Sequence, residues 1–361
     1  MTKVAIIIPT MNRPDFILRQ FEFYEQMKSP HPVYISDSSN EENAEKIKSG
    51  IKKFKNFEIT YQWAPPGKDC TYSLMPLIKE KYCMAVNDDD IMIPKTISEC
   101  ADFLEEHPDY GTCAGKQVNV YFTQEDFNKP YGIIERQTRP FGRSIEDDNM
   151  LVRIQDLSSP NKAMPFICFA VTRIEVERDM RNITKNVSLM EDMFEFLVLN
   201  LLIMSGKSKM LDKLGYIMQR SIIRFPNHRL REDFLSFPAI IEYWRFYKEG
   251  VLQILQKRGI SQENSLRTVK WLFAKYLYEN LYYSADMAMV NASNKEPVVK
   301  TDFTGKRRSK IKKLRHLISH LPFLKAIYYK INPPDYVDRS ESRYFNDFKV
   351  VKDFLEKNKT P

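Results

Sequence analysis

The chain has 361 residues, 43% of them apolar and 28% charged, which predicts a soluble globular protein with a well-buried core and two domains. No apolar run reaches the roughly 18 residues of a membrane span, and the N-terminus enters an apolar strand without a basic leader. We therefore expect a protein that is cytoplasmic, or peripheral at the cytoplasmic face of the membrane. The net charge of +8 favours an anionic partner, and five cysteines without metal-ligand spacing favour free thiols.

The first predicted unit is a buried strand over residues 4–8, a polar loop and a helix that Pro14 opens. The loop falls at the carboxyl edge of a parallel sheet, where its polar groups can hold a nucleotide and Arg13 can pair with a diphosphate. Helix capping alone is the alternative explanation. The candidate donor-binding residues in this loop are Pro9, Thr10, Asn12 and Arg13.

Two further strand, loop and helix units follow. The first has a strand over 33–36 that ends in Asp37 and a lysine-rich helix over 41–54. Asp37 is a candidate for binding a ribose or a base N–H, although an Asx-turn would place an aspartate at the same point. The second has a strand over 57–63 and a helix through about residue 80. Between these lies Lys68, which follows Gly67 and is either a donor-binding cation or a solvated lysine.

The next apolar strand, over 82–86, runs into three consecutive carboxylates, Asp88, Asp89 and Asp90. Adjacent carboxylates repel, so a site that keeps them together favours a divalent cation, and oxygen ligands favour Mg²⁺ or Mn²⁺. A solvated turn before a helix that starts at Pro94 is the alternative. The repeated units predict a doubly wound α/β sheet, and the absence of glycine-rich phosphate loops argues against dinucleotide and P-loop proteins.

Four of these features, in this order and spacing, resemble the nucleotide-binding half of glycosyltransferase family 2. They are the loop over 9–14, the strand-terminal Asp37, the Gly67-Lys68 loop and the aspartate cluster over 88–90. The resemblance implies the GT-A fold, a Rossmann-like, mostly parallel central sheet flanked by helices. It also implies an inverting hexosyltransferase that uses a nucleotide-sugar, usually a UDP-sugar, with Mn²⁺ or Mg²⁺ on its diphosphate. Two assignments of the metal motif remain open. Asp88 and Asp90 bind the metal, or Asp88 binds the ribose and Asp89 the metal.

The resemblance further implies a general base about a hundred residues beyond the metal motif. Glu191 and Asp192 stand there, at the start of an apolar helical run. By resemblance Asp192 is the base and Glu191 orients neighbouring groups or the acceptor, whereas capping of the helix is the alternative. After a last strand over 216–224, His228 is a candidate additional ligand of the metal or diphosphate, with a solvated loop histidine as the alternative.

The remaining segments are less informative. We expect a strand over 111–122, a polar irregular stretch over 123–160 and a buried strand over 163–174. Helices are expected over 239–258 and 261–288. The segment 306–330 has nine Lys or Arg residues, no acidic residue and an apolar stripe, which suits an anionic membrane surface or a helix packed on its own domain.

The expected organisation is a GT-A domain over 1–231 and a C-terminal helical region over 232–361. Residues 1–122 would bind the nucleotide-sugar and residues 123–231 would supply the acceptor side and the base. The resemblance implies an acceptor that is a glycan or a lipid-linked glycan, in the synthesis of cell-surface polysaccharide or glycolipid. The alternative function is a non-catalytic protein that binds an anionic surface or nucleic acid through its basic C-terminal region. That alternative does not explain carboxylates at the ends of strands.

Overall fold

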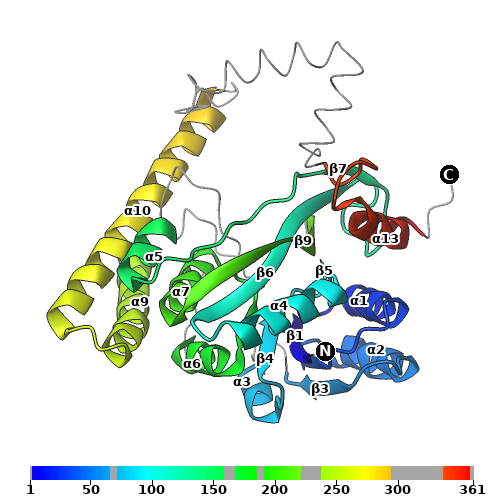
Figure 1. The fold of residues 1–361 in the computed structure, drawn as a ribbon. Coiled ribbons are helices and arrows are strands. Elements are labelled where there is room, and N and C mark those ends of the chain that lie inside the picture. Colours follow the sequence, from blue (N-terminus) through cyan, green and yellow to red (C-terminus); the bar gives the residue numbers. More distant parts are fainter. Residues whose placement is uncertain are drawn as a thin grey trace. The chain divides into compact units, whose positions relative to one another are not determined.

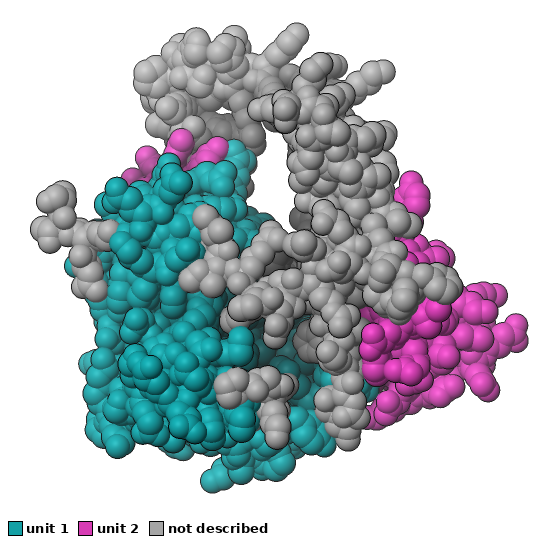
Figure 2. Space-filling model, turned by 180° about the vertical axis from the view of Figure 1, so that it is seen from behind, with its two compact units in different colours: residues 1–226, 346–361 teal, residues 227–345 magenta. Residues whose placement is uncertain are grey.

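A computed structural model of the chain describes residues 2–65, 71–157, 167–184, 191–220, 237–293 and 336–357, and these form two compact units. The first unit comprises residues 1–226 and 346–361, and the second comprises residues 227–345 (Figure 2). We expected a boundary near residue 231 and a C-terminal region that stays outside the first domain. In the structure, the last helix instead belongs with the first unit.

The first unit is built on a sheet flanked by helices (Figure 1). Its first four strands are parallel and lie in the order β3-β2-β1-β4. The chain moves outward from β1 to β2 and β3, and then returns to place β4 on the other side of β1. Such a reversal is a topological switch point, where α/β proteins bind ligands at the carboxyl ends of the strands. The elements concerned are β1 (Val4–Thr10), α1 (Pro14–Gln26), β2 (Val33–Asp37), α2 (Glu41–Gly50), β3 (Ile59–Trp63), α3 (Thr71–Leu74) and β4 (Tyr82–Ala85).

The other half of the sheet continues from β4 in the order β8-β6-β9-β5, with β7 paired to β6. Strand β8 is antiparallel to both β4 and β6, and β9 is parallel to β6, so β1, β4, β6 and β9 end at one edge of the sheet. The elements are β5 (Ile91–Met92), α4 (Pro94–Glu106), β6 (Tyr110–Phe122), β7 (Ile134–Gln137), α5 (Met150–Leu157), β8 (Val171–Arg173), α6 (Ile174–Thr184), α7 (Glu191–Ser205) and β9 (Lys207–Arg220).

Local chemistry explains the first elements. The apolar residues Val4–Ile8 of β1 are completely buried, as expected for a strand covered on both faces. Pro14 occupies the first turn of α1, where its missing N–H costs nothing, and the side chain of Asn40 caps α2 by accepting from the Asn43 N–H. The predicted α/β fold is therefore confirmed, with helices flanking a mixed sheet.

Several predicted elements differ from the observed ones. The stretch expected to be irregular contains β7 and α5. The strand expected over 163–174 was wrong in its described part, since β8 has three residues and the chain is already helical from Ile174. Apolar residues in this stretch pack from a turn and a helix as well as from a strand, so an apolar run alone did not distinguish these states. Strand β9 starts at Lys207, nine residues before the expected start.

The last helix, α13 (Phe345–Glu356), packs on α1 although the two are more than 300 residues apart in sequence. The rings of Phe23 and Phe354 lie 5.1 Å apart, and the Gly132 N–H donates to the Leu355 carbonyl over 3.1 Å. Glu356 accepts a hydrogen bond from the Ile134 N–H. These contacts fix α13 and the loop between β6 and β7 to the edge of the first unit.

The second unit contains two long helices, α9 (Phe237–Lys257) and α10 (Gln262–Ser293), which pack through aromatic side chains. Tyr243 and Phe273 are buried with their ring centroids 5.4 Å apart. Gly259 has a φ of +79°, the left-handed conformation that glycine allows where a helix ends. Within the described part of the chain, no helix combines the length and the apolar character needed to cross a membrane.

Candidate donor-binding site

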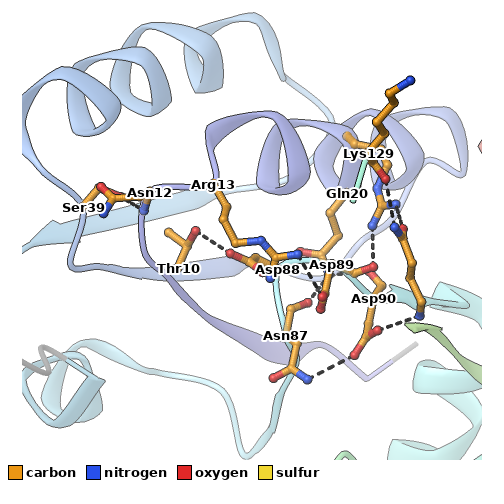
Figure 3. A network of polar contacts seen from close by, with 12 residues as sticks. Thr10, Asn12, Arg13, Gln20, Ser39, Asn87, Asp88, Asp89, Asp90 and Lys129 are labelled. Carbon is orange, nitrogen blue, oxygen red and sulfur yellow. Dashed lines mark hydrogen bonds and ion pairs between the residues drawn. The ribbon is translucent and has the colours of Figure 1, made fainter. Parts of the chain in front are cut away.

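The ends of β1 and β4 meet at the switch point and bring the first predicted loop onto the aspartate cluster (Figure 3). The Thr10 hydroxyl donates to Asp88 Oδ2 over 2.7 Å. Arg13 places one nitrogen 2.9 Å from Asp88 Oδ1 and the other 2.9 Å from Asp89 Oδ2. Two segments that are about 75 residues apart in sequence thus form one charged site.

Arg13 is the counter-ion of two carboxylates. Its side chain is 11% exposed, those of Asp88 and Asp89 are 4% and 16% exposed, and its guanidinium lies over the Phe16 ring. Burial lowers the pKa of Arg13, but the neighbouring carboxylates raise it by more, so the guanidinium stays charged. To bind a diphosphate as predicted, Arg13 would therefore either contact the phosphate and the aspartates together or release the aspartates.

The three aspartates lie in different environments. Burial raises the pKa of Asp88 to about 7, against the opposing effect of Arg13. Asp90 is 1% exposed, and its carboxylate accepts from the Tyr216 hydroxyl, the Gln219 N–H and the Asn87 amide. Burial and the charge of Asp89 raise its pKa well above the usual range. Asp90 thus links the turn to β9, whereas Asp89 is the most exposed of the three.

Helix α1 holds the main chain of this aspartate turn from inside the protein. Arg19, which is completely buried, donates to the Asp89 carbonyl. The neighbouring Gln20 amide donates to the carbonyls of Asn87 and Asp90 over 3.0 and 2.8 Å. Sequence reasoning missed both residues. A signal was present, because Arg19 stands three residues after Phe16 and four before Phe23, on an apolar helix face.

The ends of β1 and β2 are also joined. Asn12, with a left-handed φ of 58°, accepts from the Asn40 N–H through its side chain, and its own N–H donates to the Ser39 hydroxyl over 2.7 Å. Asp37 is completely buried and accepts from the Ser39 N–H, the Asx-turn contact, and from the Tyr61 hydroxyl. Pro9 is exposed at the edge of β1.

The aspartate cluster can be tested as a binding site for a divalent cation. No group of three or more His, Cys, Asp or Glu side chains in the described part of the chain is arranged to hold a metal ion. The Asp90 oxygens are occupied by hydrogen bonds, whereas Asp89 has one oxygen on Arg13 and lies nearest to solvent. One carboxylate suffices when phosphate oxygens and waters complete the coordination of Mg²⁺. Asp89 fits that kind of site, and Asp90 in this conformation does not.

Other predicted site residues are described in part or not at all. Lys68 and His228 lie outside the described residues. The backbone of α7 starts at Glu191, so Glu191 and Asp192 occupy a helix N-terminus, while their side chains lie outside the description. Their catalytic roles stay predictions.

Comparison with solved structures finds likeness to chains that include the protein TarS of S. aureus. The chain is similar to S. aureus TarS 1–349, at 14% sequence identity over 99% of this chain and 91% of that chain, with a TM-score of 0.49. For the same protein in complex with UDP-GlcNAc, identity is 14%, the coverage is 77% and 73%, and the TM-score is 0.48. No protein-family model and no curated protein sequence matches the chain. At this identity and these TM-scores, the likeness by itself transfers no function.

Proposed function

We propose that the chain is a glycosyltransferase of GT-A type that binds the diphosphate of a nucleotide-sugar at the carboxyl edge between β1 and β4. One observation carries this proposal: Thr10, Arg13, Asp88 and Asp89 are assembled at the topological switch point. Ligands bind at this position in open α/β sheets. A carboxylate can bind a cation and an arginine can bind a phosphate. The site therefore suits a diphosphate that binds together with a cation.

Asp89 is the proposed ligand of Mn²⁺ or Mg²⁺. Asp88, in the turn after β4, and Asp37, at the end of β2, are proposed to contact the nucleoside. A bound cation would neutralise the diphosphate and stabilise it as a leaving group. Arg13, when it leaves the carboxylates, can pair with a phosphate through its planar donors. This assignment selects the second of the two alternatives for the metal motif. It is supported by the burial and the hydrogen bonds of Asp90.

The acceptor is activated, in this proposal, by Asp192. Its carboxylate would take the proton of an acceptor hydroxyl while the hydroxyl oxygen bonds to the sugar carbon and the bond to the diphosphate breaks, which inverts the configuration of the sugar. Glu191 would orient the acceptor or its neighbours. We propose a glycan or lipid-linked glycan as acceptor and a UDP-sugar as donor, and the TarS complexes with UDP and UDP-GlcNAc make UDP the first nucleotide to test.

A thermal-shift panel tests the donor site. UDP, GDP, CDP and ADP are each added to the full chain with and without Mn²⁺. A ligand at 100 times its Kd stabilises a protein by about 2.7 kcal/mol, so UDP with Mn²⁺ should raise the Tm by several degrees and UDP alone by less. If no nucleotide diphosphate changes the Tm with Mn²⁺, the proposed donor site is refuted. Release of UDP from a UDP-sugar in the presence of acceptor then tests transfer.

The alternative function, binding of an anionic surface through residues 306–330, concerns a segment outside the described residues. It predicts salt-sensitive binding to a polyanion, with no effect of nucleotide on the Tm. The same panel, extended with heparin at low and high salt, separates the two functions.

A further inference from the structure

Arg19 is an unusual buried cation. It lies on α1, its side chain is 1% exposed, and none of its contacts within the described residues is an ion pair with a carboxylate side chain. Arginine is rarely buried without such a partner, because removing the charge from water is costly. Its direct hydrogen bonds go to neutral acceptors that the fold holds in place, and the nearby charges of Asp89 and Asp90 add to the stabilisation of the cation.

Those acceptors come from three separate segments. One terminal nitrogen of Arg19 donates to the Asp89 carbonyl over 2.5 Å. The other donates to the Pro130 carbonyl, in the loop between β6 and β7, and to Oε1 of Gln219 at the end of β9, each over 2.5 Å. A guanidinium can serve three acceptors in fixed directions because its donors form a rigid planar fork, which a lysine ammonium lacks.

Gln219 extends the connection to the neighbouring aspartate. Its main-chain N–H donates to Asp90 Oδ1 over 3.0 Å, and its side-chain amide donates to the Lys129 carbonyl over 2.9 Å. Arg19 therefore fixes the main chain at Asp89 directly and the side chain of Asp90 through Gln219. With the main chain held on the side of α1, the side chains of Asp88 and Asp89 extend toward Arg13 (Figure 3).

We infer that Arg19 is a positioning residue of the donor site, which holds the Asp89 main chain so that the Asp89 carboxylate stands where a divalent cation and a diphosphate can reach it. The inference rests on the proposed function and adds to it a residue that touches neither nucleotide nor metal. Loss of a group that orients a metal ligand typically lowers the metal affinity by about 10- to 100-fold. Loss of Arg19 should accordingly weaken metal binding in addition to its effect on the stability of the fold.

Arg153 supplies a matched control. It belongs to the same unit, is 6% exposed and likewise donates to main-chain carbonyls, those of Ile203, Asp147 and Asp148, none of which belongs to the aspartate turn. Arg19→Met and Arg153→Met each remove a buried guanidinium from carbonyl acceptors. Arg19→Lys and Arg153→Lys keep the charge but lose the planar fork.

The experiment measures the Mn²⁺ concentration that gives half-maximal stabilisation of each full-length variant at saturating UDP, by thermal shift. We expect Arg19→Met and Arg19→Lys to require at least about tenfold more Mn²⁺ than the wild type. The Arg153 variants should lose Tm but keep the wild-type Mn²⁺ requirement. Should Arg19→Met fail to fold, Arg19→Lys decides the question.

An unchanged Mn²⁺ requirement in Arg19→Lys, or an equal increase in the two Arg153 variants, would overturn the inference and leave Arg19 as a structural residue. The proposed function fails separately. If the wild type itself shows no stabilisation by UDP and Mn²⁺, the donor site is wrong and this inference falls with it. If the wild type shows it and the Arg19 variants match the wild type, only the inference falls.

Discussion

Replacement of Arg13 with Gln tests the charge balance of the aspartate cluster. Arg13 contacts two carboxylates at 2.9 Å, and all three side chains are at most 16% exposed. Removing one partner of a buried pair costs about 3–5 kcal/mol, because the remaining charge is left uncompensated. Since Asp89 keeps some contact with water, we expect the lower end, about 3 kcal/mol at pH 8. For a unit of this size, that loss lowers the Tm by about 6–12 °C.

The stability that Arg13→Gln loses should depend on pH in a defined direction. Burial raises the pKa of Asp88 to about 7, so the folded state binds a proton that the unfolded state releases above pH 4. The cost of the buried charge is therefore full above about pH 7 and is relieved as the pH falls toward 4. Removing Arg13 raises the pKa of Asp88 further. Arg13→Gln should consequently lose most stability at pH 8 and clearly less at pH 5.

Arg143→Gln is the control, because Arg143 pairs with Asp156 at 2.6 Å while both side chains stay about one-fifth exposed. Both side chains are more exposed than those of Arg13 and Asp88, so loss of this pair should cost less, about 1 kcal/mol, and should be similar at pH 8 and pH 5. Thermal unfolding of the wild type and both variants at the two pH values provides the measurement. Equal losses of Arg13→Gln at both pH values, or a loss at pH 8 no larger than that of Arg143→Gln, would refute the reasoning.

Three further predictions concern the other proposed residues. Asp89→Asn should abolish the Mn²⁺-dependent part of nucleotide stabilisation, whereas Asp90→Asn should lower the Tm and leave the Mn²⁺ requirement near that of the wild type; the opposite pattern would assign the metal to Asp90. Asp192→Asn should keep the donor affinity and lower the turnover by about 100-fold or more, and unchanged turnover would direct the search for the base to Glu191. The basic segment 306–330 should bind anionic vesicles at low salt and release them at high salt; equal sedimentation after its Lys and Arg residues are changed to Gln would exclude a role in membrane attachment.

Much of the first unit could be predicted because its signals are local. An apolar run followed by a polar loop and a proline marks β1 and α1, and the repeat of this pattern predicts parallel strands. The second half was harder to predict. Strand β8 has only three residues, and the pairing of β6 with β9 joins segments about a hundred residues apart, which no short-range pattern specifies. The return of α13 to α1 likewise depends on packing between distant residues.

The aspartate cluster shows the same limit at the level of single side chains. Asp88, Asp89 and Asp90 are chemically identical and adjacent, so the sequence predicts a charged turn but cannot rank them as ligands. Their environments are set by partners far away: the turn pairs with Arg13 about 75 residues before it, and Asp90 bonds to Tyr216, 126 residues after it. A buried hydrogen-bonded carboxylate is costly to release, whereas one near solvent on a single arginine can exchange that partner for a cation. The fold therefore gives three chemically equal residues different environments: Asp90 is bonded to β9, Asp88 is buried against Thr10 and Arg13, and Asp89 keeps the most contact with solvent.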